Sequence, residues 1–396
     1  MSMADRQNLE YLSVQYGAFM ALGLDIGVTT GRRRGLLKSV WKFAFNMLCT
    51  FYMQYGFGNF VIHSITDIDA ITASLSMFNQ GILLTFKVSL IILKGEEMLK
   101  LIWDMNILSR GANAMEYEKW LSENRNGRLI ALGYFYACWA AVTCVAVIPW
   151  IFLLYEYFQG MGVNLRLPFQ VEFPFDHGGG LLISILNYMC TLLLVHAWLN
   201  MSVGIDTLFG WYIFAISGHF RILRNKIKEA AAKIDLHNNH RDFVRDVAAF
   251  VSYHNRTLKF VEDLNRLYGE ILWGEISMSC LQICFLLYSL ANDENFANIP
   301  FHFVASAAIT MQLMIYCFGG EKLKNENDML CDDIYMAMPW EKMYPSEKKL
   351  MLLPLLRTQK ETSLTGLYFI INRNLLVFIF KTAFSFITLL GAIKEI

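Results

Sequence analysis

The hydrophobic positions of the chain gather into long apolar stretches that alternate with polar, charged connections. A helix needs about 20 consecutive, mainly apolar residues to cross the hydrocarbon core of a bilayer. Stretches of this kind lie at about 41–62, 70–93, 129–158, 181–209, 264–290, 299–318 and 364–392. We therefore predict an all-α, polytopic membrane protein with seven transmembrane helices and a single domain over residues 1–396.

The composition agrees with this pattern. Hydrophobic residues make up 55% of the 396-residue chain and charged residues only 17%, whereas soluble domains contain about 25% charged residues. The mean hydropathy is +0.37. Residues 1–16 are polar and contain no apolar run or small-residue cleavage site, so we expect no secretory signal peptide.

Lys and Arg are unevenly distributed among the connections. They are abundant before the first stretch and after the second, fourth and sixth, whereas 64–69 and 291–298 contain none and 159–180 contain only Arg166. Because cytoplasmic loops are enriched in these residues, we predict a cytoplasmic N-terminus and an extracellular C-terminus. A G-protein-coupled receptor has the opposite orientation, and the chain also lacks the Asp/Glu-Arg-Tyr and Asn-Pro-x-x-Tyr motifs of such receptors.

Two of the charged connections also carry apolar residues at helical spacing. Phe243, Val247 and Phe250 are an example within 213–263, and 321–360 has a similar mixture of charge and large apolar residues. We predict that these segments, about 213–263 and 321–360, form helices that extend into a cytoplasmic anchor region. Their apolar faces need partners.

Motifs for catalysis, metal binding or cofactor binding are absent from the sequence. There is no His-Glu-x-x-His and no Gly-x-Ser-x-Gly, and we expect no paired carboxylates in a span. Cys280 and Cys284 are one helical turn apart but have no nearby His or acidic residue in the sequence, and His237, His240 and His254 lie among charges on what we interpret as a solvated helix face. We expect no enzyme activity, no cofactor, no metal and no nucleic-acid partner.

The last eighty residues carry a distinctive order of residues. Tyr316-Cys317-Phe318-Gly319-Gly320-Glu321-Lys322-Leu323 closes the sixth stretch, Tyr335 and Trp340 follow, and the final stretch contains Lys381, Phe384-Ser385 and Thr388-Leu389-Leu390. This order resembles the C-terminal signature of insect odorant receptors, although Phe384 stands where those receptors more usually have Tyr. The connection between the fourth and fifth stretches is short, so the chain resembles a ligand-tuned subunit and not the co-receptor, which has a long insertion there.

The resemblance implies a function. It implies a subunit of an odorant-gated, non-selective cation channel that binds a small volatile within the membrane and opens a central pore. Its partners would be odorant receptor co-receptor subunits in a heterotetramer, the odorant and membrane lipid, in the plasma membrane of olfactory sensory neurons. Two alternatives stay open: a seven-helix receptor that signals through a cytoplasmic partner, and a gustatory-type receptor channel.

The resemblance also places an odorant pocket in the membrane, toward the outside, between the second, third, fourth and sixth spans. With the predicted orientation, the candidate residues are Ala73, Ser76, Thr143, Val147, Trp150, Asn187, Tyr188, Ser306 and Thr310. Together they would give an apolar, aromatic cavity with a few hydrogen-bonding groups. Each residue can equally be explained by helix packing.

The final stretch carries a polar stripe. Lys381, Ser385, Thr388 and Ala392 are spaced by three or four residues and therefore share one helix face, which should face water or protein because a Lys in lipid is costly. By resemblance this face lines the pore, with Ser385, Thr388, Leu389 and Ala392 at a narrow outer gate. The alternatives are hydrogen bonds from Ser385 and Thr388 to the preceding turn and a snorkelling Lys381; snorkelling is also the expectation for Lys87.

The anchor region is the expected assembly surface. By resemblance, subunits meet through this region, and the candidate contact residues are Tyr335, Trp340, Leu352 and Leu356. The alternative is that these side chains pack only within their own chain.

Overall fold

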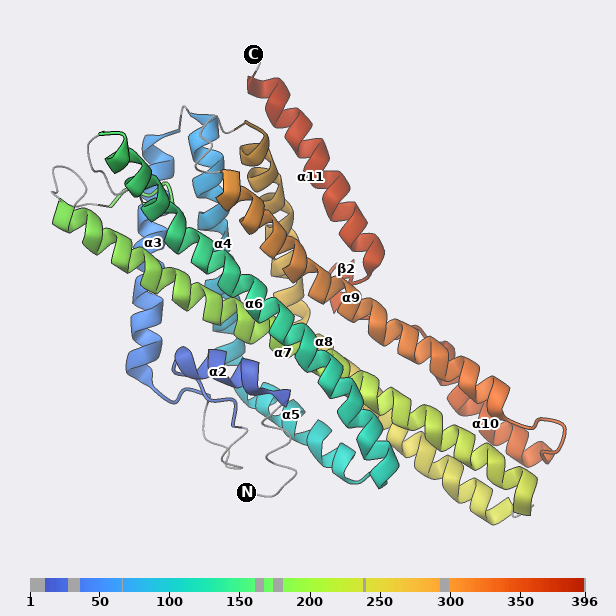
Figure 1. The fold of residues 1–396 in the computed structure, drawn as a ribbon. Helices are drawn as coiled ribbons and strands as arrows, with labels where there is room; N and C mark the ends of the chain where they lie inside the picture. The colour runs from blue at the N-terminus through green and yellow to red at the C-terminus, as the bar shows by residue number, and fades with distance from the viewer. Residues whose placement is uncertain are drawn as a thin grey trace.

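The computed structural model describes residues 11–27, 36–65, 67–160, 167–173, 181–237, 240–292 and 299–394. Nearly all of the regular structure is helical (Figure 1). The helices are α2 (Ser13–Ala21), α3 (Val40–His63), α4 (Ile68–Leu93), α5 (Gly95–Arg110), α6 (Ala114–Phe158), α7 (Leu181–His237), α8 (His240–Asn292), α9 (Ile299–Ala337), α10 (Pro345–Gln359) and α11 (Arg373–Lys394). Two short strands, β1 (Thr365–Gly366) and β2 (Phe369–Ile370), pair antiparallel before α11.

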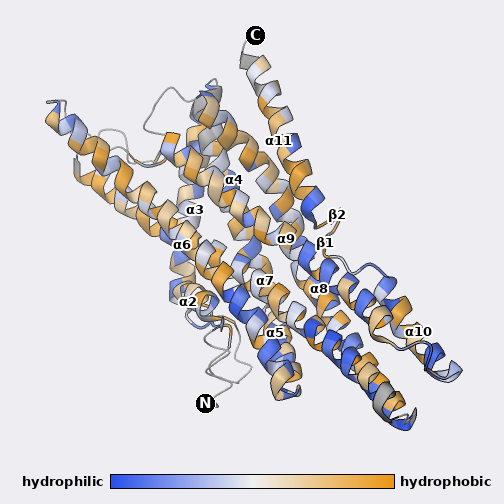
Figure 2. Cartoon of the chain, turned by 45° about the vertical axis from the view of Figure 1, so that its right-hand side comes forward, coloured by the Kyte–Doolittle hydropathy of each residue, from blue (hydrophilic) through white to orange (hydrophobic). Residues whose placement is uncertain are grey.

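The longest helices are far longer than a membrane is thick. The 57 residues of α7 correspond to about 85 Å at 1.5 Å per residue, compared with a hydrocarbon core of about 30 Å. Figure 2 shows that α7, α8 and α9 change along their length from mainly hydrophobic to mainly hydrophilic sequence. Each therefore belongs to two environments.

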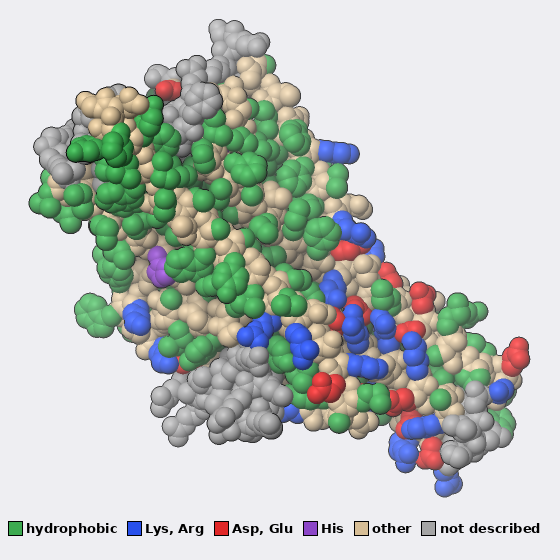
Figure 3. Space-filling view, viewed as in Figure 1, with side chains coloured by type: hydrophobic (Ala, Val, Ile, Leu, Met, Phe, Trp, Pro, Cys, Tyr) green, Lys and Arg blue, Asp and Glu red, His purple; other side chains and the backbone are tan. Residues whose placement is uncertain are grey.

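These two environments divide the molecule into an apolar body and a charged arm. We define the charged arm as residues 213–237 of α7, 240–263 of α8 and 321–337 of α9, together with α10. Hydrophobic side chains cover most of the visible body, whereas Lys, Arg, Asp and Glu gather on the arm (Figure 3). Five of the described helices, α4, α6, α7, α8 and α9, are long and apolar enough to cross a membrane.

Helix α7 lies at the centre of the bundle and packs against α6, α8 and α9. Aromatic residues fill this centre: the ring of Phe209 lies 4.7 Å from that of Tyr316 and 5.2 Å from that of Tyr268. All three are fully buried. Burial of such large rings is a main source of packing energy in a helical bundle.

The last helix begins later than predicted. Residues 364–372 were expected to belong to the final span, but they form the hairpin of β1 and β2, in which Leu367 has a φ of +53°. Asn372 then starts α11, because its Oδ1 accepts a hydrogen bond of 2.9 Å from the backbone N–H of Leu375. Asn is a strong helix N-cap, so this signal was present in the sequence and outweighs the apolar run.

A second correction concerns His254. We expected it on a solvated face, but it is buried between the helices of the charged arm. The apolar residues at helical spacing around it, among them Phe250 and Leu258, are buried as well, and they carry the imidazole inward with them. The side chains of His237 and His240 lie outside the described residues.

Candidate functional site: the last helix, the pocket residues and a buried charged cluster

Helix α11 has one packed face and one free face. Leu375, Leu376, Ile379 and Ala383 are buried, and the helix packs against α8 and α9. The predicted pore residues Lys381, Ser385, Thr388, Leu389 and Ala392 are all exposed. The structure thus keeps the predicted polar stripe together and turns it away from the chain's own core.

The free face of α11 is only partly polar. Exposed Val377, Phe378, Phe384 and Phe386 flank the stripe, and Thr388 Oγ1 donates a hydrogen bond of 2.8 Å to the carbonyl of Ser385. The side chain of Leu390 is not among those described. Figure 1 shows α11 standing at the edge of the bundle and diverging from α9 toward its C-terminal end. In a single chain, the free face of α11 is therefore neither wholly polar nor covered by other helices.

The pocket residues predicted on α6 and α7 fall into two groups. Trp150 Nε1 donates a hydrogen bond of 3.0 Å to Tyr188 Oη, which in turn donates to the carbonyl of Ala146. The two rings are nearly perpendicular, with centroids 5.8 Å apart. Asn187, which precedes Tyr188 in the sequence, is buried. Thr143, Val147 and Trp150 of α6 are exposed, whereas Asn187 and Tyr188 of α7 are buried.

The remaining pocket residues lie on α4 and α9. Ser76 is buried, and its carbonyl accepts a hydrogen bond of 3.2 Å from Gln282 of α8. Ser306 Oγ donates a hydrogen bond of 2.7 Å to the carbonyl of His302, and Thr310 is half-buried. The side chain of Ala73 lies outside the described residues.

A small cavity lies at the end of the body away from the arm, between α3, α4, α9 and residues 167–173. Its lining includes Phe57, Ser74, Met77, Phe169, Phe301 and His302. Its volume is about 20 Å³, enough for one water molecule, which needs about 10–15 Å³. Ser76 and Ser306 are near its lining residues in sequence but are not part of it.

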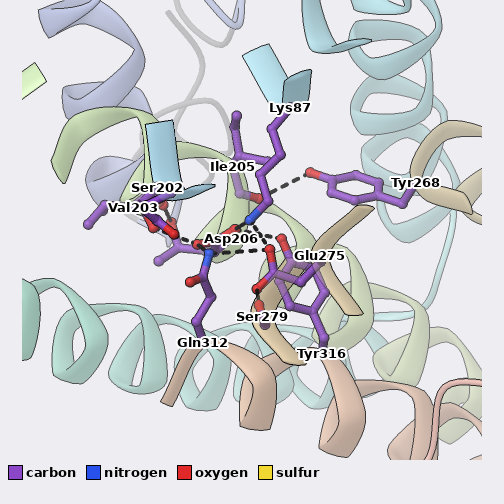
Figure 4. A network of polar contacts seen from close by, with 12 residues as sticks. Lys87, Ser202, Val203, Ile205, Asp206, Tyr268, Glu275, Ser279, Gln312 and Tyr316 are labelled. Carbon is purple, nitrogen blue, oxygen red and sulfur yellow. Dashed lines mark hydrogen bonds and ion pairs between the residues drawn. The ribbon is translucent and has the colours of Figure 1, made fainter. Parts of the chain in front are cut away.

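Sequence reasoning missed a group of fully buried charged residues. Lys87 of α4, Asp206 of α7 and Glu275 of α8 are each 0% exposed. Lys87 Nζ lies 2.9 Å from Asp206 Oδ1 and also contacts Glu275 Oε2. Figure 4 shows the three side chains pointing toward one another from different helices.

Hydrogen-bond donors surround this ion pair. Asp206 Oδ2 accepts bonds from Ser202 (2.8 Å), Tyr134 Oη (3.1 Å) and Gln312 Nε2 (2.8 Å), and Oδ1 accepts from Tyr316 Oη (2.5 Å). Ser279 donates 3.1 Å to Glu275. We call Lys87, Asp206, Glu275 and these donors the buried cluster; it joins α4, α6, α7, α8 and α9.

The buried cluster corrects two expectations. Lys87 does not snorkel to an interface, and the spans do contain paired carboxylates. Asp206 and Glu275 lie in different apolar stretches, and nothing local to either stretch indicates that the two face each other. A buried charge survives only when it is paired and hydrogen-bonded, so the isolated Lys87, Asp206 and Glu275 in apolar stretches were the available signal.

The C-terminal signature connects this cluster to α11. Tyr316 donates to Asp206, and one turn later a Cβ at Gly320 would lie 2.1 Å from the carbonyl oxygen of Ile371. Glu321 then pairs with Arg373, the first residue of α11, at 2.9 Å. The segment Tyr316 to Leu323 therefore touches the buried cluster on one side and the start of α11 on the other, and only Gly at 320 permits the approach.

The predicted assembly residues lie on the charged arm. Tyr335, Leu352 and Leu356 are exposed, as is Leu353 beside them. Trp340 is half-buried; its Nε1 donates 2.7 Å to the carbonyl of Tyr335, and the two rings are 6.1 Å apart. Large apolar side chains that gather on an otherwise charged surface mark an interaction site.

Comparison with known proteins identifies the class. The profile described as 7tm Odorant receptor matches residues 67–384. The structure of the insect olfactory receptor OR5 from Machilis hrabei, in complex with eugenol, superposes with a TM-score of 0.75 over 97% of this chain and 100% of that one, at 14% identity. The fold is that of an all-α polytopic membrane protein, as predicted.

Two curated Drosophila melanogaster proteins resemble most of the chain. Odorant receptor 45a is 26% identical, covering 85% of this chain and 87% of that protein, and odorant receptor 47a is 24% identical, covering 96% and 98%. The chain belongs to the 7tm odorant receptor family. It is a multi-pass membrane protein of a family of sensory receptors, not of enzymes, and the family assignment drawn from the C-terminal signature is confirmed.

Proposed function

We propose that the chain is the ligand-tuned subunit of an odorant-gated, non-selective cation channel. It would assemble with odorant receptor co-receptor subunits into a heterotetramer, with its N-terminus in the cytoplasm, in the plasma membrane of olfactory sensory neurons. Membership of the odorant receptor family supports the sensory role, and three features of the structure support the channel.

The free face of α11 carries the proposal. A helix that is packed on one side by Ile379 and Ala383 and exposes Ser385, Thr388 and Ala392 on the other is suited to line water between subunits. Polar groups facing lipid are costly, and a central pore in a tetramer removes that cost. Ser385, Thr388, Leu389 and Ala392 would form the gate, and Lys381, nearer the start of the helix, would lie in the vestibule below it.

The exposed apolar side chains of the charged arm support assembly. Tyr335, Leu352 and Leu356 lie on a surface where a monomer would have no reason to place them. In a tetramer they would contact a neighbouring subunit, with Trp340 holding Tyr335 in place. The arm would then hold the assembly together while the body keeps the freedom to change shape.

The odorant would bind in the body between α4, α6, α7 and α9. The proposed pocket residues are Ala73, Ser76, Thr143, Val147, Trp150, Asn187, Tyr188, Ser306 and Thr310. A volatile has few polar atoms, so burial of its apolar surface at about 25 cal/mol per Å² must supply most of the affinity. Hydrogen bonds from Trp150 to Tyr188 and from Tyr188 to the carbonyl of Ala146 join α6 to α7 here. An odorant that separated these residues would move the two helices apart.

The buried cluster and the signature support a path from pocket to gate. Gln312 and Tyr316 lie on the same helix as Ser306 and Thr310 and donate to Asp206. The same helix continues to Gly320 and Glu321, which contact Ile371 and Arg373 at the start of α11. A shift of α9 caused by an odorant would therefore be transmitted to α11 through backbone contact and an ion pair.

Whole-cell recording from cells that express this chain with the co-receptor, without added G-protein components, tests the proposal. A panel of volatiles should evoke a rapid cation current that requires both subunits. A response that is blocked by a non-hydrolysable GDP analogue in the recording pipette would overturn the channel and favour the receptor that signals through a cytoplasmic partner.

Cysteine substitution tests the pore assignment separately. A charged thiol reagent should alter the current of Thr388→Cys but not that of Ala383→Cys, which lies on the packed face of α11, with the unsubstituted chain as background. Proven labelling of Thr388→Cys with an unchanged current would contradict the assignment.

A further inference from the structure

A cleft lined by cations lies where α6 meets the charged arm. Lys119 and Ser122 of α6 and Arg221, Arg224, Asn225 and Lys228 of α7 line a cavity of about 260 Å³; we call it the basic cleft. The spacing explains it: residues 221, 224, 225 and 228 repeat by three and four and so share one face of α7, and 119 and 122 do the same on α6.

The cleft carries positive charge beyond what its ion pairs neutralise. Arg221 pairs with the buried Glu123 at 2.6 Å, Arg224 with Glu326 at 3.1 Å and Asp333 at 3.0 Å, and Lys228 with Asp333 at 2.9 Å. Lys322 joins the same network at Glu123, 3.1 Å away. Three carboxylates thus face five cations: Lys119, Arg221, Arg224, Lys228 and Lys322.

Donors without partners line the same space. Asn225 Nδ2 is buried and has no hydrogen-bond partner within the described part of the chain. Lys119 is exposed and forms no ion pair with any described residue. An Arg guanidinium offers five N–H donors, so Arg221 and Arg224 retain donors beyond those that face Glu123 and Glu326. Lys119 and Asn225 thus supply N–H donors of the lining that have no partner, and an acceptor-rich anion is the chemistry that completes them.

From these observations we infer that the basic cleft binds a polyphosphorylated anion. Arg and Lys donors from two helices bind phosphate oxygens through charge-assisted hydrogen bonds, and Arg does so in a bidentate manner. The volume of about 260 Å³ lies just below the lower end of small-molecule pockets, about 300 Å³. It suits a phosphorylated headgroup or a small polyphosphate and excludes a whole lipid.

The position of the cleft relates it to the membrane. Ser122 precedes Leu129, where the third apolar stretch begins, by seven residues, about 10 Å along a helix. Figure 3 shows Lys and Arg gathered at the boundary between the hydrophobic body and the arm. Basic pockets at that level of a membrane protein bind phosphoinositide headgroups, and the same chemistry also admits a free inositol phosphate. The site is independent of the proposed channel function.

Lys119→Glu is the discriminating variant, because Lys119 is exposed and unpaired, whereas loss of Arg221 would strand the buried Glu123. Lys119→Gln is a milder companion that removes charge without reversing it. Lys348→Glu, on exposed α10 of the same arm, is the charge-matched control. Unfolding midpoints of all four full-length proteins show whether they are equally folded.

Binding is measured on the purified full-length receptor by thermophoresis, with two probes: short-chain phosphatidylinositol 4,5-bisphosphate and soluble inositol 1,4,5-trisphosphate. The dissociation constant should rise about tenfold or more for Lys119→Glu, by less for Lys119→Gln, and stay within about twofold for Lys348→Glu. Binding of the lipid alone identifies a membrane headgroup as the ligand, and binding of both identifies the free anion as sufficient. Binding of neither probe, or an equal loss in Lys348→Glu, would overturn the inference.

Discussion

The buried cluster and the ion pairs of the charged arm contain the same residue types in opposite environments. In the cluster, Lys87, Asp206 and Glu275 are fully buried. Each carboxylate oxygen that pairs with Lys87 accepts one further hydrogen bond, from Tyr316 at Asp206 and from Gln312 at Glu275. In the arm, a pair such as Lys233 and Asp246 at 2.6 Å leaves 55% and 22% of the two side chains exposed. Water competes for one set of charges and is excluded from the other.

This contrast shows which charges determine the structure. A surface pair contributes about 0–1 kcal/mol because solvent screens it and side-chain entropy opposes it. Removal of one partner from a buried pair leaves an unpaired charge and costs about 3–5 kcal/mol. The cluster therefore fixes how five helices pack, whereas an exposed pair such as Lys233 and Asp246 contributes little to stability.

Lys87→Met tests the stronger side of the comparison. We expect the free energy of unfolding to fall by about 3–5 kcal/mol, because Asp206 and Glu275 lose their common partner without access to water. Chemical denaturation of the purified receptor in detergent measures it. The triple variant Lys87→Met, Asp206→Asn, Glu275→Gln should recover part of the loss, since no charge is then stranded. A single variant as stable as the unsubstituted chain would show that the cluster is neutral or hydrated.

Gly320→Ala tests the contact through which the cluster reaches α11. The added Cβ would lie 2.1 Å from the carbonyl oxygen of Ile371, so α9 and the start of α11 must separate, at a cost of about 1–3 kcal/mol. For Gly320→Ala, both the odorant-evoked current and the unfolding midpoint should be lower than for the unsubstituted chain. Gly133→Ala on α6 is the control: nothing lies within 4 Å of its added Cβ, and Ala is the better helix former there. Equal behaviour of the two variants would argue against a tight contact at Gly320.

His254 tests burial within the arm. Burial, followed by the charge of Arg357, lowers its pKa from 6.5 to about 4. At His254 the unfolded chain therefore binds a proton more readily than the folded one. The folded state has its full stability above about pH 6.5 and loses stability as the pH falls toward 4. Between pH 7.5 and 5.5 we expect a loss of about 1 kcal/mol that is absent in His254→Gln. Parallel pH profiles of the two proteins would mean that His254 is hydrated.

Lys233→Ala tests the weakest side of the comparison. Its partner Asp246 is partly exposed, so the free energy of unfolding should fall by no more than about 0.5 kcal/mol, and less at high salt because exposed pairs are screened. The same denaturation assay applies. A loss as large as that of Lys87→Met would erase the distinction between cluster and arm.

Several features of the fold could be predicted from the sequence, because their causes are local. The apolar stretches at 129–158, 181–209 and 264–290 gave parts of α6, α7 and α8, and the helical spacing of Phe243, Val247 and Phe250 gave a buried face in the arm. The polar stripe of α11 also followed from spacing. The start of α11 did not follow from hydropathy, because the apolar run begins at residue 364, before the capping residue Asn372.

The sequence by itself determined the class of protein, the cores of the long helices, the buried face around Phe243, Val247 and Phe250, and the family signature. Only the tertiary structure decided which helices are neighbours. Lys87 and Asp206 are separated by 119 residues and Tyr316 and Asp206 by 110, and no periodicity within one helix specifies such a meeting. Helical order is a property of a few consecutive residues, whereas the position of a buried charge depends on the packing of five helices at once. In the sequence, Lys87, Asp206 and Glu275 are therefore visible only as isolated charged residues within apolar stretches.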